Sequence, residues 1–439
     1  MASRLSRWGL LAIFVGALAV RSVAIVLLGI RMGGDSQSYI SRAEAVVNGG
    51  VVALFGLPLQ HAPLYSLFLA PGVALGVDVR WYAVVAQAIL GAATAFVVAL
   101  LAARGTGSAF VGYLSGSVAA VHLTFPFWGT YVLSDTLFLF VLSVTAERLL
   151  ALGASRRVLV DSLVAGALLI LTALSRPNAA PFVLLAPAVG VLAAHGSGRR
   201  LGRIVVGMAA PALVLIAAYG VLTALGKAPA PMAIGGQVTD WARSAVYVGL
   251  VWTEQGRATA GVDVGVNPPP VLALMNAAQR EAFLGTPVDQ DPFGFIARRP
   301  EFFLEQAVRK LKLLFAPVLP EYSFGHALVS GAYFLALYVL GALGVATAAR
   351  RHLPFVFLCA LGIVAFTLPC VLTFVDYDQR YRLPIELFLI PLAGAGCVWL
   401  RALLPARGQS TARTRTPRPL ASVTGRTTEA TGSTTPLSR

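Results

Sequence analysis

Residues 82–103 read YAVVAQAILGAATAFVVALLAA, an apolar run without a charged side chain. The hydrocarbon core of a bilayer is about 30 Å thick, and an apolar helix of about 20 residues crosses it. The rest of the chain has the same character, since 57% of its 439 residues are hydrophobic and only 12% are charged. Soluble domains carry about 25% charged residues. The composition therefore excludes a water-soluble globular protein and predicts a polytopic membrane protein.

Ten such runs occur, and we expect an all-α fold: a bundle of about ten transmembrane helices with interfacial helices in its outer loops. The predicted spans are 8–30, 82–103, 108–125, 131–150, 160–175, 179–195, 204–226, 327–349, 353–375 and 383–403. The three cysteines lie far apart in apolar runs, which excludes a disulfide scaffold.

The first span has two unusual features. Its Ala-Leu-Ala at 17–19 could mark a cleaved signal peptide, but the apolar stretch continues to Ile30, which favours a retained helix. Arg21 lies inside the span, where an unpaired charge costs roughly 2.5–3.5 kcal/mol. We expect Arg21 to reach water at the outer end or to pair with an acid such as Asp135.

Arginines indicate the orientation of the spans. With the N-terminus in the cytoplasm, basic residues collect in every inner connection, whereas the short outer connections balance basic and acidic residues. We therefore expect both termini inside and two large outer loops, about 31–80 and about 227–326, the second with helical stretches at 270–284 and 292–315. Residues 64–77 are apolar but too short to cross, so they are predicted to be interfacial or re-entrant. The inner basic residues are Arg4, Arg7, Arg104, Arg156, Arg157, Arg199, Arg200, Arg203, Arg350, Arg351 and Arg401.

The chain divides into a membrane domain, 1–404, and a tail, 405–439. The tail is rich in Thr, Ser, Pro and Arg without apolar periodicity, so we expect it to be disordered. Its six arginines against Glu429 give it +5 of the formal net charge of +15. Anionic lipid of the inner leaflet is the partner expected for this charge, rather than nucleic acid.

A polar stretch beginning at Asp35 follows the first span. Apolar residues recur at helical spacing over 36–48, which predicts an amphipathic helix on the membrane surface that ends at the following glycines. Asp35 has two compatible interpretations. It could cap this helix by accepting from the backbone N–H of Gln37 or Ser38, or it could act as a general base at the membrane boundary.

Further titratable residues lie at predicted outer ends: His61, Asp135, Arg176, Arg380 and Arg382. A guanidinium binds two phosphate or carboxylate oxygens at once, so these residues could form an anion site. Simpler interpretations stay open, since Arg380 and Arg382 could pair with Asp376 and Asp378, and His61 could be an ordinary interfacial residue.

The ordered motifs over about 31–403 carry a family resemblance. They are Gly34-Asp35-Ser36-Gln37-Ser38-Tyr39, His61-Ala62-Pro63-Leu64-Tyr65, Ser134-Asp135, Arg176, Arg299-Pro300 through Lys310-Leu311, and Arg380-Tyr381 through Pro384. The set resembles the GT-C superfamily of integral-membrane glycosyltransferases, specifically the bacterial branch related to protein O-mannosyltransferases and the lipid A aminoarabinose transferase.

The resemblance implies an enzyme of the bacterial plasma membrane that moves a sugar from a polyprenyl-phosphate donor to an acceptor hydroxyl, with inversion. The acceptor could be a protein, a glycan or a lipid. Asp35 matches the catalytic general base. The implied donor-phosphate residues are His61, Arg176, Arg380 and Arg382, with Tyr39, Tyr65 and Asp135 supporting the site.

The sequence departs from the family pattern at three positions. Ser36 replaces a second acid, and Ala62 replaces the first proline of a Pro-Pro pair. Gln60 stands where some relatives place an acid that helps to hold a metal, which argues against a tightly bound metal and leaves room for a weakly bound divalent cation. Two other functions stay open: a transporter or flippase of lipid-linked sugars, and a non-catalytic membrane assembly protein. The absence of repeats and the outer position of the charges argue against the transporter.

Overall fold

The computed structural model describes residues 5–56, 63–193, 198–229, 292–318, 322–372 and 380–403, with Gly236 and Thr239. All regular elements in these ranges are helices, and the one β-type pairing among them is an isolated bridge between Arg31 and Tyr131. The all-α prediction is confirmed. Residues 404–439, and with them the whole basic tail, lie outside the described ranges.

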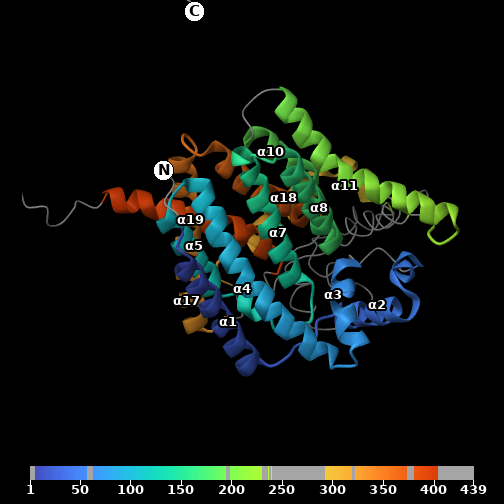
Figure 1. Ribbon diagram of the computed structural model, residues 1–439. Coiled ribbons are helices and arrows are strands. Elements are labelled where there is room, and N and C mark those ends of the chain that lie inside the picture. The colour runs from blue at the N-terminus through green and yellow to red at the C-terminus, as the bar shows by residue number, and fades with distance from the viewer. Residues whose placement is uncertain are drawn as a thin grey trace, which may run out of the picture. The chain divides into compact units, whose positions relative to one another are not determined.

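Eight helices are long and apolar enough to cross a membrane, as expected of a multi-pass membrane protein (Figure 1). They are α1 (Arg7–Leu28), α4 (Val79–Thr106), α7 (Asp135–Ala151) with its 3₁₀ extension η2 (Leu152–Ala154), α8 (Val158–Ser175), α11 (Gly198–Ala224), α17 (Phe324–Ala348), α18 (Leu353–Leu372), and α19 (Leu383–Leu403) with the preceding 3₁₀ turn η5 (Arg380–Arg382). Each matches one of the ten predicted spans.

The other two predicted spans contain shorter helices. The long helix within the run at 108–125 is α5 (Ala109–Ala120), whose 12 residues rise about 18 Å, less than the hydrocarbon core. The run at 179–195 is divided among η3 (Pro177–Ala179), α9 (Ala180–Leu185) and α10 (Pro187–Ala193). Proline explains the second division, since Pro187 begins a new helix. After α5 the chain breaks at 121–124 and then forms the four-residue helix α6 (Phe125–Trp128).

Helices also form where interfacial elements were predicted. α2 (Ser36–Gly49) buries Tyr39, Ile40 and Ala43, and is followed by η1 (Val51–Gly56). α3 (Pro63–Ala74) is the short helix expected near 64–77, and it packs against α2 and α4. In the large second loop, α15 (Pro292–Arg298) and α16 (Pro300–Leu314) match the helical stretch predicted at 292–315. The stretch predicted at 270–284 lies outside the described residues. That these helices lie on the membrane surface stays a prediction.

Small residues let the helices pack closely. α4 contacts α1, α5 and α7, while α7 contacts α8 and α8 contacts α11 (Figure 1). At the α4–α5 contact, a Cβ on Gly112 would lie 2.8 Å from the Ala99 carbonyl oxygen. Apolar surface gains nothing by moving from lipid to protein, so such contacts hold the helices together by van der Waals packing.

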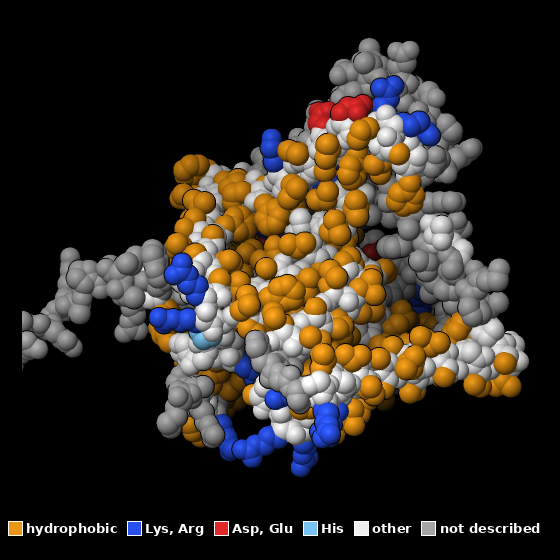
Figure 2. Space-filling model, turned by 90° about the horizontal axis from the view of Figure 1, so that it is seen from above, with side chains coloured by type: hydrophobic (Ala, Val, Ile, Leu, Met, Phe, Trp, Pro, Cys, Tyr) orange, Lys and Arg blue, Asp and Glu red, His pale blue; other side chains and the backbone are white. Residues whose placement is uncertain are grey.

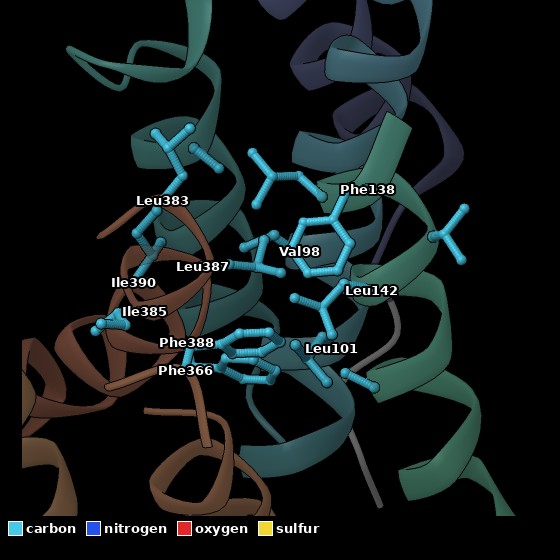
Figure 3. Packing of buried hydrophobic residues seen from close by; sticks show 14 of the residues in the cluster. Val98, Leu101, Phe138, Leu142, Phe366, Leu383, Ile385, Leu387, Phe388 and Ile390 are labelled. Atoms are coloured by element: carbon cyan, nitrogen blue, oxygen red, sulfur yellow. The ribbon is translucent and has the colours of Figure 1, made fainter. Parts of the chain in front are cut away.

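The helices differ in how far they are enclosed. α19 is 78% buried over its apolar window, against 17% for α1 and α11. Figure 3 shows the surroundings of α19: Phe388 and Leu387 face Phe366 of α18, Phe138 of α7 and Val98 of α4. Apolar side chains cover much of the described outer surface (Figure 2), as lipid contact requires. The polar residues that begin α19 are therefore held inside the bundle.

Candidate functional site

Asp135, the first residue of α7, is a buried carboxylate bound by two arginines. Its side chain is 1% exposed. Arg176 Nη1 lies 2.9 Å from Oδ1, and Arg380 Nε donates to Oδ2 at 2.8 Å. Both arginine side chains are themselves largely enclosed, at 7% and 12% exposed. Charges buried this far are stable only when they are paired, so the three residues form one electrostatic unit.

The connectivity of the helices explains why these residues meet. α7 begins at Asp135, α8 ends directly before Arg176, and η5 leads into α19. Successive helices of a bundle run in opposite directions, which brings the start of α7, the end of α8 and the start of α19 to one end. The sequence analysis placed Asp135, Arg176 and Arg380 on one face, and the structure brings them into contact.

Asp35 extends this unit toward solvent. It occupies the N-cap position of α2 with φ −87° and ψ −10°, but its side chain makes no capping hydrogen bond. Ser36 Oγ accepts from the Gly33 N–H at 2.7 Å instead. The Asp35 carboxylate is 40% exposed, and its Oδ2 lies 3.6 Å from Arg380 Nη1. The expected capping bond is therefore wrong, and the carboxylate faces the arginine. We call Asp35, Asp135, Arg176 and Arg380 the Asp135 cluster.

Tyr39 and Tyr65 pack beneath this cluster. The Tyr39 hydroxyl lies 3.3 Å from Ser134 Oγ, and its ring meets the Tyr65 ring edge-on at 4.9 Å. Burial raises the pKa of Tyr39 above its ordinary value, an effect opposed by the hydrogen bond to Ser134 and by the nearby arginines. The hydroxyl therefore stays protonated at neutral pH. Both tyrosines are enclosed rather than lining an open surface, and their role in supporting a site stays a prediction.

Sequence reasoning missed three residues around the cluster. The Arg176 guanidinium carbon lies 5.6 Å from the Tyr381 ring, and that of Arg380 lies 5.9 Å from the Trp128 ring. Gln87 Nε2 donates to the carbonyls of Gly129 and Tyr131, at 3.1 and 2.8 Å. Gln87 does have a sequence signal, because it is a lone amide in the apolar run 82–103. Trp128 gave no signal of its own, and Tyr381 stood out only as part of the Arg380-Tyr381 motif, without a role in the site.

Arg382 lies apart from the Asp135 cluster. Its side chain is 0% exposed, donates through Nε to Glu386 and through Nη1 to the Ala316 carbonyl at 2.7 Å, and stacks over Phe334 at 3.8 Å. Successive residues of a 3₁₀ turn diverge by about 120°. Arg380 and Arg382 therefore point toward different partners. Asp376 and Asp378, the alternative partners, lie outside the described residues.

Glu386 joins Arg382 to the segment after α5. Its Oε2 accepts from Thr124 Oγ1 at 2.9 Å and lies 3.5 Å from His122 Nε2. The His122 and Glu386 side chains are 0% exposed. We call Arg382, Glu386, His122 and Thr124 the interior cluster. Apart from Arg382, none of these residues was singled out from the sequence. Each is a single polar residue in an apolar run, and the sequence does not show which of them contact one another in the fold.

Arg21 differs from its expectation. It is 3% exposed and donates to the carbonyls of Ala17 and Ala120, at 3.1 and 3.3 Å. The expected pairing with Asp135 is wrong, because Asp135 is already bound by two other arginines. The last carbonyls of a helix lack partners within it, and Ala120, which ends α5, supplies one of them.

The remaining site predictions are untested. His61 and Gln60 lie outside the described residues. Within the described ranges, no three His, Cys, Asp or Glu side chains form a group that could hold a metal ion. A scan of the chain against protein-family models found no match, and a search of curated proteins found none either.

Proposed function

We propose that this membrane protein is a glycosyltransferase that moves a sugar from a polyprenyl-phosphate donor to an acceptor hydroxyl. The observation that supports this proposal is the Asp135 cluster: an accessible carboxylate, Asp35, faces arginines that a second carboxylate holds in place. A base beside fixed cations is what displacement of a phosphate by a hydroxyl requires. By resemblance, the reaction takes place at the outer face of a bacterial plasma membrane, and the arginine distribution favours both termini in the cytoplasm.

In the proposed reaction, Asp35 takes the proton of the acceptor hydroxyl as its oxygen attacks the anomeric carbon. The bond between that carbon and the phosphate oxygen breaks, its electron pair leaves with polyprenyl phosphate, and the configuration inverts. A positioned base contributes about 10²–10⁴-fold. Arg176 and Arg380 stabilise the negative charge of the leaving phosphate, and His61 belongs to the same proposed phosphate site.

Asp135 acts through the arginines in this scheme. Its two oxygens hold Arg176 and Arg380 at 2.9 and 2.8 Å, so their guanidinium groups are oriented before any ligand arrives. Preorganised charges need little rearrangement as the leaving group develops its charge. Arg382 is committed to Glu386 and Ala316, so we assign it a structural role and not a place on the phosphate.

The test is Asp35→Asn, which keeps the shape of the side chain and removes the base. Purified protein in lipid nanodiscs is assayed for sugar transfer from a polyprenyl-linked lipid extract, followed by mass spectrometry. We expect a loss of about 10²–10⁴-fold. The matched control is Asp78→Asn, an exposed acid at the N-cap of α4 that pairs with Arg80. Full transfer by Asp35→Asn would show that another group is the base.

A transporter or flippase of lipid-linked sugars is the second candidate. The observation in its favour is the set of charges buried among apolar helices, Arg21 and the interior cluster, since ionisable groups inside spans often mark transport pathways. The discriminating experiment places fluorescent lipid-linked sugar in proteoliposomes. Movement between leaflets without sugar transfer would favour the transporter. Neither movement nor transfer would favour the assembly protein.

A further inference from the structure

Trp128 borders the Asp135 cluster from the segment between α5 and α7. It ends the short helix α6 and is 4% exposed. The Arg380 guanidinium, which binds both Asp135 and Asp35, lies 5.9 Å from the centre of its ring. Tyr131 packs against the same ring, with centroids 4.9 Å apart. The indole is therefore fixed beside the cation that the proposed function assigns to phosphate.

The indole N–H of Trp128 is buried and has no hydrogen-bond partner among the described residues. Two carbonyls in the same segment, those of Gly129 and Tyr131, already accept from Gln87. A buried donor without an acceptor costs about 1–3 kcal/mol, and native proteins rarely leave one unmatched. Such a donor at the edge of a polar cluster indicates an acceptor that arrives with a ligand.

We propose that the Trp128 indole N–H donates a hydrogen bond to a phosphate oxygen of the donor lipid, beside Arg380. This inference rests on the proposed function. An indole N–H can only donate, and a phosphate oxygen only accepts at neutral pH. The neighbouring guanidinium attracts the same anion, so one ligand group satisfies both. Trp128 is then a binding residue that sequence reasoning did not assign.

The test measures binding of sugar-free polyprenyl monophosphate to the full-length protein in nanodiscs. Trp128→Phe keeps an aromatic face for Arg380 and removes only the N–H and the second ring. We expect the Kd to rise about tenfold, as for a lost hydrogen bond to a charged group. Trp81→Phe, at an exposed position in the first turns of α4, is the matched control and should bind as the wild type does.

The possible outcomes distinguish a failure of the Trp128 contact from a failure of the proposed function. If the wild type binds the lipid phosphate and Arg380→Gln weakens binding while Trp128→Phe does not, the indole contact is refuted and the proposed function stands. If the wild type binds no polyprenyl phosphate, both are refuted. A sugar contact instead of a phosphate contact would leave the sugar-free Kd unchanged in Trp128→Phe, and this also overturns the proposal.

A second measurement needs no Trp128 variant. In wild-type protein labelled with 5-fluorotryptophan, the fluorine resonances of the other tryptophans are assigned from their own Phe variants, which leaves that of Trp128 by elimination. The chain has six tryptophans. We expect the Trp128 resonance to shift on addition of polyprenyl monophosphate and not on addition of the uncharged polyprenol. No shift with the phosphate would contradict the proposal.

Discussion

Arg380 of the Asp135 cluster and Arg382 of the interior cluster are separated along the chain by a single residue, Tyr381. The two clusters nevertheless differ in how far solvent reaches them. Arg380 reaches an acid that is 40% exposed, whereas Arg382 and Glu386 are both 0% exposed. The cause is the 3₁₀ turn η5. Successive residues of such a turn point in different directions, so Arg380 and Arg382 meet different partners. One short motif can therefore supply an arginine for ligand binding, Arg380, and an arginine that stabilises the fold, Arg382.

The partners in each cluster support this division. In the Asp135 cluster, two arginines and two acids meet at the end of the bundle, so an incoming anion can compete for the cations. In the interior cluster, Glu386 is already shared by Arg382 and Thr124. A change in the first should therefore alter binding, and a change in the second should alter stability.

The largest effect on stability is expected from Glu386→Ala. It leaves the Arg382 guanidinium buried without its carboxylate, and breaking a buried ion pair costs about 3–5 kcal/mol. Thermal unfolding in nanodiscs measures the loss. Glu301→Ala is the control, since that acid is 69% exposed and lies 3.9 Å from Arg299. Equal stability of the two variants would mean that the interior cluster does not hold the fold.

Next in size is the effect of Arg380→Gln on binding. It removes one cation from the proposed phosphate site and should raise the Kd for polyprenyl monophosphate about 10- to 100-fold, as for a lost hydrogen bond between charged groups. Arg80→Gln, at a position 56% exposed, serves as the control. An unchanged Kd with a lowered unfolding temperature would show that Arg380 stabilises the fold and does not bind the phosphate.

Gly344→Ala tests the packing of α17 against α19 without altering a charge. α17 approaches α19 so closely at Gly344 that an added Cβ would lie 1.9 Å from the Leu392 carbonyl oxygen. α17 also carries Phe334, which covers Arg382. Overpacking typically costs about 1–3 kcal/mol. Gly16→Ala, where a Cβ meets nothing within 4 Å, should not destabilise the protein. Unfolding midpoints of both variants check this.

The smallest change concerns Lys310 of α16, a buried cation outside both clusters. It is 5% exposed, its Nζ donates to the Val371 carbonyl at 3.3 Å, and burial lowers its pKa from 10.5 to about 8. Between these values the unfolded chain binds more protons, so the free energy of unfolding should rise with pH. Unfolding scans from pH 7.5 to 9 should show this rise in the wild type and not in Lys310→Met. Lys312→Met, in the same helix, is the control.

The sequence predicted most of the fold because span length is a local property. Apolar runs and helix breakers located eight long helices, and alternating helix direction placed Asp135, Arg176 and Arg380 at one end. It did not predict the length of α5, because the run at 108–125 is apolar in composition throughout while the helix ends at Ala120. Sequence reasoning also grouped Arg382 with Arg380, since direction within a 3₁₀ turn depends on backbone dihedrals that composition does not reveal.

The early end of α5 has a chemical consequence. The backbone that follows is irregular, yet its carbonyls at Gly129 and Tyr131 accept from Gln87, that at Thr130 from the Arg31 N–H, and that at Val132 from Ser36. No water is needed to satisfy these carbonyls. Under the proposed function, carbonyls that already have protein partners attract less water, which suppresses hydrolysis, the reaction in which water replaces the acceptor. In Gln87→Leu, part of the sugar should therefore be released as free sugar.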